Sequence, residues 1–182
     1  MATFSVPTRE EVSANNQQIF DKLQQNLGFV PNLYATMAHS ENALGNFLTA
    51  SGAKSSLNNK EKEVINLVVS QVNDCRYCQS AHTAIGKMNG FTDEQILEIR
   101  QGIASFDTKL DALAKFTYNA SVNRGRPSQA VTDALLATGY TKENVVDIVL
   151  IISEITVTNY LHGITQIPID FPIAPELELS LA

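Results

Sequence analysis

Two helix patterns separated by a two-residue break constrain the fold of this chain more than any other feature. The first begins at a capping signature, Asn58-Asn59-Lys60-Glu61, and carries an apolar face over residues 60–72. Asn73-Asp74 interrupts it and can cap a second helix, Cys75 to Asn89, which ends at Gly90. Because the break is so short, we expect the second helix to return antiparallel to the first. The sequence therefore predicts a helical hairpin in the middle of the chain.

Helix signals also dominate the rest of the chain. A capping box at residues 8–11 predicts a helix that ends at Gly28. The β-branched stretch 145–157 follows a cap at Thr141 and is too long for an ordinary strand, so we expect a buried helix there. That stretch belongs to a helix expected over residues 142–161, and further helices are expected over residues 32–38, 40–52, 92–102, 108–122 and 128–137. The predicted fold class is all-α, with one domain over residues 1–182.

The end of the chain has a different character. Pro168, Pro172 and Pro175 exclude a regular helix. Apolar residues alternate with others at Ile169, Phe171 and Ile173, and again at Leu177, Leu179 and Leu181. This pattern predicts an extended apolar arm over residues 168–182, and such an arm must be covered by something. Two coverings are equally compatible with the sequence: the chain's own core, or a neighbouring subunit.

The composition favours a globular protein and disfavours nucleic-acid-binding and membrane-spanning classes. The chain has 182 residues, 44% of them apolar, and a net charge of −6, which suits a globular fold that needs neither disulfide nor metal to hold its core. The acidic balance argues against a nucleic-acid partner. No apolar run suggests a membrane span, and the first residues do not resemble a signal peptide. We therefore expect a reducing, cytoplasmic location, where a close cysteine pair is more often catalytic or metal-binding than structural.

The chain's two cysteines lie in the second helix of the predicted hairpin. Cys75, Cys78 and His82 are spaced three and four residues apart and would share one helix face. At the helix start, free N–H groups and the positive end of the dipole favour a thiolate. Two thiols at this spacing can also close into a disulfide, which permits a two-electron cycle. A zinc site is disfavoured, because only three ligands are local and no second C-x-x-C supplies the others.

Glu63 joins this set only if the hairpin forms. In an unbroken helix the 12 residues from Glu63 to Cys75 would span about 18 Å. After a reversal at Asn73-Asp74, Glu63 and His82 reach similar depths on facing helices. The carboxylate can then orient the imidazole, whose other nitrogen faces Cys78. We predict that His82 activates Cys78 and that Cys75 is its partner, although a position at the helix tip favours Cys75 as the attacking thiol.

The complete pattern, Glu63-x11-Cys75-x2-Cys78-x3-His82-x3-Gly86, resembles the signature of the alkylhydroperoxidase D / carboxymuconolactone decarboxylase family. The likeness to the peroxidase-related branch extends to Asn32-Leu33, Met37-Ala38-His39-Ser40, and residues 64–73, 158–160 and 169–172. It implies an all-helical fold, a homo-oligomer (dimer, trimer or hexamer) and thiol-dependent reduction of hydroperoxides. It also implies that Glu63, Cys75, Cys78 and His82 form a proton relay.

The chain departs from this family at two positions. The best-studied members carry a second histidine between the cysteines, where this chain has Tyr77. A phenol with a pKa near 10 is a poor base at neutral pH, although it can donate a hydrogen bond or shape a pocket. Relatives often carry a histidine where Gly163 aligns; here His162 is adjacent, and we assign it no role.

The function predicted from these observations is cysteine-based hydroperoxide reduction without a cofactor or metal. No phosphate loop or cofactor motif is recognisable, so electrons would come from an external dithiol or a thioredoxin-like partner. One alternative is a thiol redox sensor that oxidises once without efficient turnover. Another is an acid/base enzyme resembling carboxymuconolactone decarboxylases, in which Glu63 and His82 act without the thiols.

Overall fold

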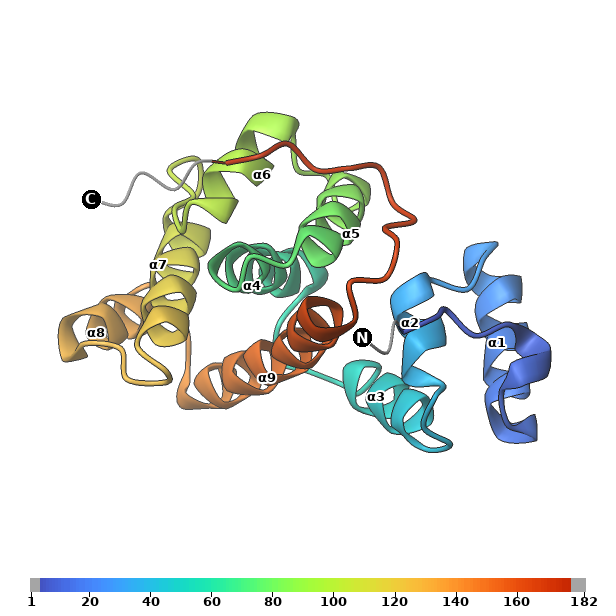
Figure 1. Ribbon diagram of the computed structural model, residues 1–182. Helices are drawn as coiled ribbons and strands as arrows, with labels where there is room; N and C mark the ends of the chain where they lie inside the picture. Colours follow the sequence, from blue (N-terminus) through green and yellow to red (C-terminus); the bar gives the residue numbers. More distant parts are fainter. Residues whose placement is uncertain (1–3, 178–182) are drawn as a thin grey trace.

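The computed structural model describes residues 4–177, and these residues form helices with no strand among them (Figure 1). The predicted all-α fold class is confirmed. Leu179 and Leu181 of the predicted arm lie outside the described residues. In chain order the elements are η1 (Arg9–Glu11), α1 (Ala14–Leu27), α2 (Asn32–Met37), α3 (Ala43–Ser51), α4 (Asn59–Val72), α5 (Arg76–Met88), α6 (Asp93–Arg100), α7 (Thr108–Val122), α8 (Gln129–Ala137) and α9 (Lys142–Thr165).

The helix α4 occupies the centre of the fold. It contacts α5, α6, α7 and α9, and Figure 1 shows these four arranged around it. Val64, Ile65, Leu67 and Val68 lie on different sides of α4, and all four are completely buried. The helices α1, α2 and α3 form a second, smaller apolar cluster beside this core. One arm of the predicted hairpin is therefore the most enclosed helix among the described residues.

Several of the predicted helix boundaries need correction, including the start of α3, which lies at Ala43 and not at residue 40. The first helix is interrupted: η1 ends at Glu11, and α1 begins after Ser13, whose side chain accepts a hydrogen bond from the Asn16 N–H. The second arm of the hairpin begins one residue later than predicted, because Cys75 is itself the N-cap of α5. The last helix continues beyond residue 161 to Thr165, where Gln166 ends it in a left-handed conformation.

The last helix, α9, was predicted to be buried, and only half of that prediction is correct. Ile148, Ile151 and Ile155 are buried against the core. The opposite face is apolar and exposed, with Val149 and Leu150 each more than half exposed. Among the described residues, α9 is the one helix whose length and composition would allow it to cross a membrane. One such helix is weak evidence, because core helices of soluble proteins pass the same criterion.

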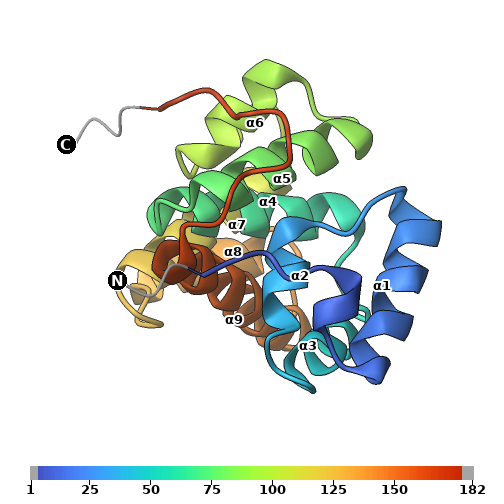
Figure 2. The same ribbon diagram turned by 45° about the vertical axis from the view of Figure 1, so that its right-hand side comes forward.

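After α9 the chain turns back over its own helices. Residues 166–177 run without regular secondary structure across α5 towards α6 (Figure 2). Ile167 and Ala174 are buried, whereas Ile173 is exposed. Of the two coverings that the sequence allowed, the described part of the arm uses the chain's own core.

Two arginines fasten this arm. Arg76 donates a 2.9 Å hydrogen bond to the Ala174 carbonyl, and Arg100 donates a 2.8 Å hydrogen bond to that of Pro175. Burial lowers the pKa of Arg100 to about 10, which still leaves its guanidinium charged at neutral pH. Its other N–H groups are satisfied by the side-chain oxygens of Gln71 and Gln79. The arm is thus held by charge-assisted hydrogen bonds to main-chain carbonyls.

Candidate functional site

The site is built on the turn between α4 and α5. Asp74 adopts a positive φ of 51°, a conformation that aspartate tolerates better than most residues. This turn places Cys75 at the tip of α5 in an extended conformation, where its Sγ accepts a 3.2 Å hydrogen bond from the Cys78 N–H. The Cys75 sulfur therefore occupies the N-cap position, which favours a negatively charged sulfur.

Cys75 and Cys78 form a disulfide within the first turn of α5. Their Cα atoms are 5.3 Å apart, which lies in the usual range for bridged cysteines. Each residue is only 2% exposed, so the disulfide lies below the surface. Oγ1 of Thr158, on α9, lies 3.7 Å from Cys78 Sγ, while its hydroxyl donates to the Ile155 carbonyl.

Glu63 and His82 meet across the hairpin, as its geometry predicts. Nδ1 of His82 lies 2.8 Å from Oε2 of Glu63, and both side chains are largely buried. Because a carboxylate can only accept, this contact places the proton of a neutral ring on Nδ1 and leaves Nε2 free to accept. His82 lies one helical turn beyond Cys78 on α5. The arrangement can therefore hold an oriented base beside the cysteine pair.

The sequence reasoning missed Asn66 and gave no physical role to Thr158. Asn66 donates a 3.0 Å hydrogen bond to Oε1 of Glu63, so both carboxylate oxygens are occupied. Its position three residues after Glu63 on one helix face could have indicated this contact. Thr158 approaches Cys78 across 80 residues of sequence, and no local pattern points to that contact.

The side chain of Tyr77 joins three parts of the chain. Its hydroxyl accepts a 3.2 Å hydrogen bond from the Leu33 N–H at the start of α2. Its ring packs against those of His162 on α9 and Phe171 in the arm. Burial and the neighbouring Asp170 carboxylate raise the pKa of Tyr77 above its ordinary value, so the phenol stays protonated at neutral pH.

The remaining histidines do not join the cysteines and Glu63. His162 is buried beside Tyr77, and Nε2 of its ring lies 3.3 Å from the Ile167 carbonyl. Burial lowers the pKa of His162, so its ring is neutral at neutral pH. His39 is exposed at the end of α2, where Nε2 lies 2.9 Å from the Ser5 carbonyl. No group of three or more potential metal ligands gathers within residues 4–177.

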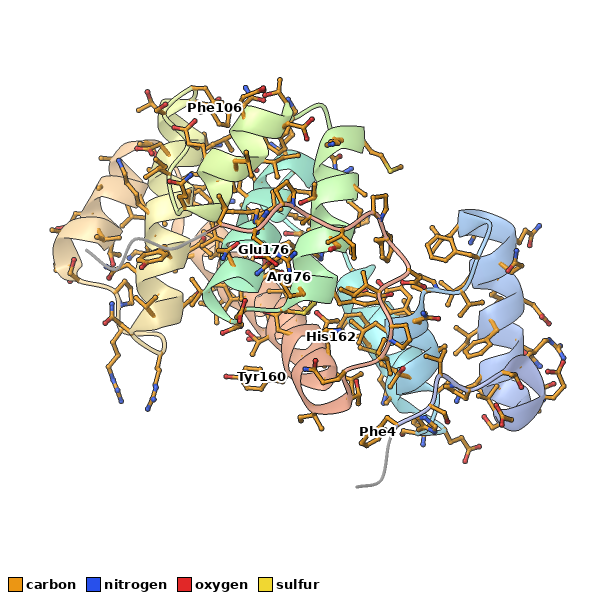
Figure 3. All side chains as sticks on the ribbon, turned by 45° about the horizontal axis from the view of Figure 1, so that its top comes forward. Phe4, Arg76, Phe106, Tyr160, His162 and Glu176 are labelled. Carbon is orange, nitrogen blue, oxygen red and sulfur yellow. A yellow bond between two sulfur atoms is a disulfide. The ribbon has the colours of Figure 1, made fainter. Side chains whose placement is uncertain are left out.

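A surface pocket of about 480 Å³ lies beside the turn that carries Cys75. It is formed by Asp74 and Arg76, on either side of Cys75, by His162 and Gly163 at the end of α9, and by residues 166–169 of the arm. Figure 3 shows Arg76 and His162 on the same side of the molecule as the arm. The disulfide is therefore buried close to a depression in the surface.

Comparison with known proteins supports the resemblance found in the sequence. Residues 38–117, which contain the hairpin and all four predicted site residues, match the model of the carboxymuconolactone decarboxylase family. No curated protein matches the chain.

Solved structures share the fold over nearly the whole chain. A peroxidase-related protein from Silicibacter sp. TM1040 is 22% identical with a TM-score of 0.80, over 90% of this chain and 89% of that one. A peroxidase-related protein with an alkylhydroperoxidase AhpD core, from Ralstonia eutropha JMP134, is 23% identical with a TM-score of 0.79, over 88% of each chain. The debrominase Bmp8, seen in one structure with 2,3,4-tribromopyrrole, is 20% identical with a TM-score of 0.75, over 93% of each chain. Residues 38–117 thus carry the sequence pattern of the carboxymuconolactone decarboxylase family, within a chain that has the alkylhydroperoxidase D-like fold.

Proposed function

We propose that this chain is a thiol-dependent hydroperoxide reductase. The observation that carries the proposal is the 2.8 Å contact between Glu63 and His82, one helical turn from the Cys75–Cys78 disulfide. An oriented imidazole beside a cysteine pair is what thiol activation requires. The relatives described as peroxidase-related share this fold, which supports the same class of chemistry.

In the proposed reaction, the Cys78 thiolate attacks one oxygen of the hydroperoxide after His82 has accepted its proton. The O–O bond breaks, the alcohol leaves with a proton, and Cys78 becomes a sulfenic acid. The Cys75 thiol then displaces water to form the disulfide, so two electrons pass from the cysteines to the peroxide. An external dithiol or thioredoxin-like protein returns them, which agrees with a reducing, cytoplasmic location.

The test is to titrate free thiols in the reduced protein before and after one equivalent of an organic hydroperoxide. The chain has only two cysteines, so thiol counts report on this pair alone. We expect rapid loss of both thiols in the wild type and a rate about 10²-fold lower in His82→Ala. His39→Ala, which alters an exposed histidine just after α2, serves as the matched control and should behave as the wild type. Equal rates in wild type and His82→Ala would remove His82 from the mechanism.

Two further measurements separate this function from its alternatives. Steady-state peroxide consumption with an excess of dithiol identifies a reductase, whereas a single stoichiometric oxidation identifies a redox sensor. Replacing both cysteines with serine should abolish peroxide reduction, whereas it would leave intact an acid/base activity of the decarboxylase type that uses only Glu63 and His82.

The similarity to a debrominase over 93% of the chain favours one second candidate, reductive removal of bromine. Two thiols and a carbon–bromine bond would give a carbon–hydrogen bond, bromide, a proton and the same disulfide. The thiol titration should therefore be repeated with 2,3,4-tribromopyrrole in place of the hydroperoxide. Faster thiol loss with the bromopyrrole than with the hydroperoxide would indicate that the substrates are aryl halides and not hydroperoxides.

A further inference from the structure

The two sulfurs of the disulfide have different hydrogen-bond partners, and the partner of Cys78 has no part in the relay proposed above. Cys75 Sγ accepts from the Cys78 N–H, a main-chain group of the same helical turn. Cys78 Sγ lies 3.7 Å from Oγ1 of Thr158, which α9 brings in from 80 residues away. Among the described residues, no hydrogen bond joins His82 to either sulfur, since its Nδ1 contacts Glu63. Within residues 4–177, the Thr158 hydroxyl is thus the side-chain oxygen or nitrogen that touches the sulfur expected to attack.

This contact lies where solvent has little access. Thr158 is 6% exposed and Cys78 is 2% exposed. A buried thiol in apolar surroundings ionises less readily than one in water, because the charge of the thiolate is poorly solvated there. A reaction that begins with a thiolate at Cys78 therefore needs a hydrogen-bond donor close to this sulfur.

The Thr158 hydroxyl is able to serve as that donor. In the disulfide form it donates a 2.8 Å hydrogen bond to the Ile155 carbonyl, a contact that threonine often makes within its own helix and that by itself implies no function. That carbonyl lies inside α9, where it also accepts the N–H of residue 159, so it keeps a partner when the hydroxyl turns away. Rotation about the Cβ–Oγ1 bond alone can therefore aim the O–H at the sulfur.

The residue after Thr158 fixes α9 against the turn that carries the cysteines. Oδ1 of Asn159 accepts a 2.9 Å hydrogen bond from the side-chain amide of Asn73, in that turn. The Asn159 amide donates to the Ser70 hydroxyl on α4, at 3.4 Å, and both residues are buried. The Thr158 hydroxyl is thus held in place beside Cys78 before any reaction, which is the condition for electrostatic stabilisation at low cost.

We propose that Thr158 stabilises the Cys78 thiolate by donating a hydrogen bond from its hydroxyl to the sulfur. The inference rests on the proposed function, in which Cys78 is the attacking thiol. Before the attack, the thiol proton passes from Cys78 to His82, and the Thr158 hydroxyl turns from the Ile155 carbonyl to the sulfur. The hydroxyl proton stays on Oγ1, so Thr158 takes no part in proton transfer and only holds the charge that His82 creates.

Other charged and titratable groups also surround Cys78, and the test must leave them unchanged. Taken by element, the contacts of the site bring in Glu63 on α4, Asp74 in the turn, Arg76, Tyr77 and His82 on α5, Arg100 on α6, His162 on α9 and Asp170 in the arm. Substitutions at Thr158 alter none of these side chains. A difference between variants with and without the hydroxyl therefore reports on the hydroxyl itself.

The test measures thiolate formation at Cys78 against pH, in the full chain with Cys75→Ser, which leaves Cys78 as the only thiol. Serine keeps an acceptor at the N-cap of α5. The ultraviolet absorption of the thiolate gives the midpoint of its formation. We expect Thr158→Val to raise this midpoint by about one pH unit, because it removes a hydrogen bond that is stronger to the charged form. Thr158→Ser keeps the hydroxyl and should return the midpoint close to that of Thr158.

Thr156→Val is the matched control on the same helix. Thr156 is half-buried, its hydroxyl donates to the Ile152 carbonyl, and it makes no hydrogen bond to a cysteine, so the midpoint should not move. An unchanged midpoint in Thr158→Val would overturn the proposal. A rise in Thr158→Ser or Thr156→Val as large as in Thr158→Val would also overturn it, since packing of α9 would then be the cause. If Thr158→Val does not fold, as judged by circular dichroism, Thr158→Ala removes the same hydroxyl.

A second measurement, in the chain with both cysteines, connects the thiolate to the chemistry. Below the midpoint, one pH unit corresponds to a tenfold change in thiolate fraction, so Thr158→Val should lose its thiols to an organic hydroperoxide about tenfold more slowly. Thr158→Ser should restore the rate. The absorption titration needs no peroxide, so the two proposals can fail separately. A raised midpoint in Thr158→Val, with no thiol loss to hydroperoxide in any variant, would overturn the proposed function and leave the role of Thr158 standing.

Discussion

At the scale of single residues, Tyr77 stands where well-studied relatives carry a relay histidine, and its surroundings give it a different task. Its hydroxyl satisfies the buried Leu33 N–H, and its ring joins α9 to the arm. A phenol whose pKa lies above its ordinary value of 10.0 cannot accept a proton from a thiol at neutral pH. In the proposed reaction, the proton path therefore depends on His82 and Glu63, while Tyr77 connects the parts of the fold around them.

Replacement of the Tyr77 hydroxyl should thus affect stability and leave the chemistry intact. We expect Tyr77→Phe to lower the free energy of unfolding by about 1 kcal/mol, because the Leu33 N–H loses its acceptor. The rate of thiol oxidation by hydroperoxide should stay within about twofold of the wild type. Urea denaturation and the thiol titration measure the two effects. A rate loss above tenfold with normal stability would place the phenol in the relay.

The same variant tests the pH dependence of stability. Burial is the main cause that raises the pKa of Tyr77 in the folded chain above its value in the unfolded chain, about 10. The stability that the neutral phenol contributes to the fold is therefore fully present below about pH 10 and is lost as the pH rises further. Burial also raises the pKa values of Tyr34 and Tyr140. In Tyr77→Phe we expect the free energy of unfolding to fall less steeply at alkaline pH than in the wild type. The fall should not disappear, because Tyr34 and Tyr140 remain. An unchanged slope between about pH 8 and pH 11 would contradict the burial of this phenol.

At the scale of elements, the sequence predicts the hairpin well because its signals are local. The break at Asn73-Asp74 and the lengths of the two helix patterns set the depth at which Glu63 meets His82. Contacts between distant segments leave no such signal. Thr158 approaches Cys78 only because α9 packs beside α5, and the exposed face of α9 is as apolar as its buried one. Hydrophobic pattern alone therefore could not tell which face of α9 lies inwards.

The contact between the arm and α2 is another long-range feature, and it can be tested directly. Asp170 accepts a 2.7 Å hydrogen bond from the Asn32 N–H, and the preceding residue, Pro31, has no side chain that could cap α2. Asp170 thus supplies the missing cap from 138 residues away. We expect Asp170→Ala to cost about 1 kcal/mol of stability, and Asp170→Asn to cost less because it keeps an acceptor.

Hydrogen exchange gives the local readout for this cap. The Asn32 N–H should exchange faster in Asp170→Ala than in the wild type, while amides of the buried α4 serve as internal controls and change only with global stability. Equal acceleration of the Asn32 and α4 amides would mean that the arm stabilises the whole fold and does not act as a cap.

At the scale of the whole molecule, the proposed cycle requires a fold that survives both opening and closing of the disulfide. The Cys75–Cys78 link closes a loop with a sequence separation of only 3, so it constrains the unfolded chain very little. The apolar core around α4 joins residues from Leu33 to Ile167 and does not depend on that link. We therefore expect reduction to lower the free energy of unfolding by at most about 2 kcal/mol, a fraction of the 5–15 kcal/mol typical of native domains.

Thermal unfolding with and without a phosphine reductant measures this difference. For a chain of this size, about 2 kcal/mol corresponds to a Tm decrease of roughly 4–8 °C, with a cooperative transition in both states. The variant with serine at both cysteine positions should unfold near the reduced wild type and ignore the reductant, which controls for effects of the phosphine itself. A reduced chain without a cooperative transition would show that the disulfide holds the fold together, and a bond with that role could not open on every turnover.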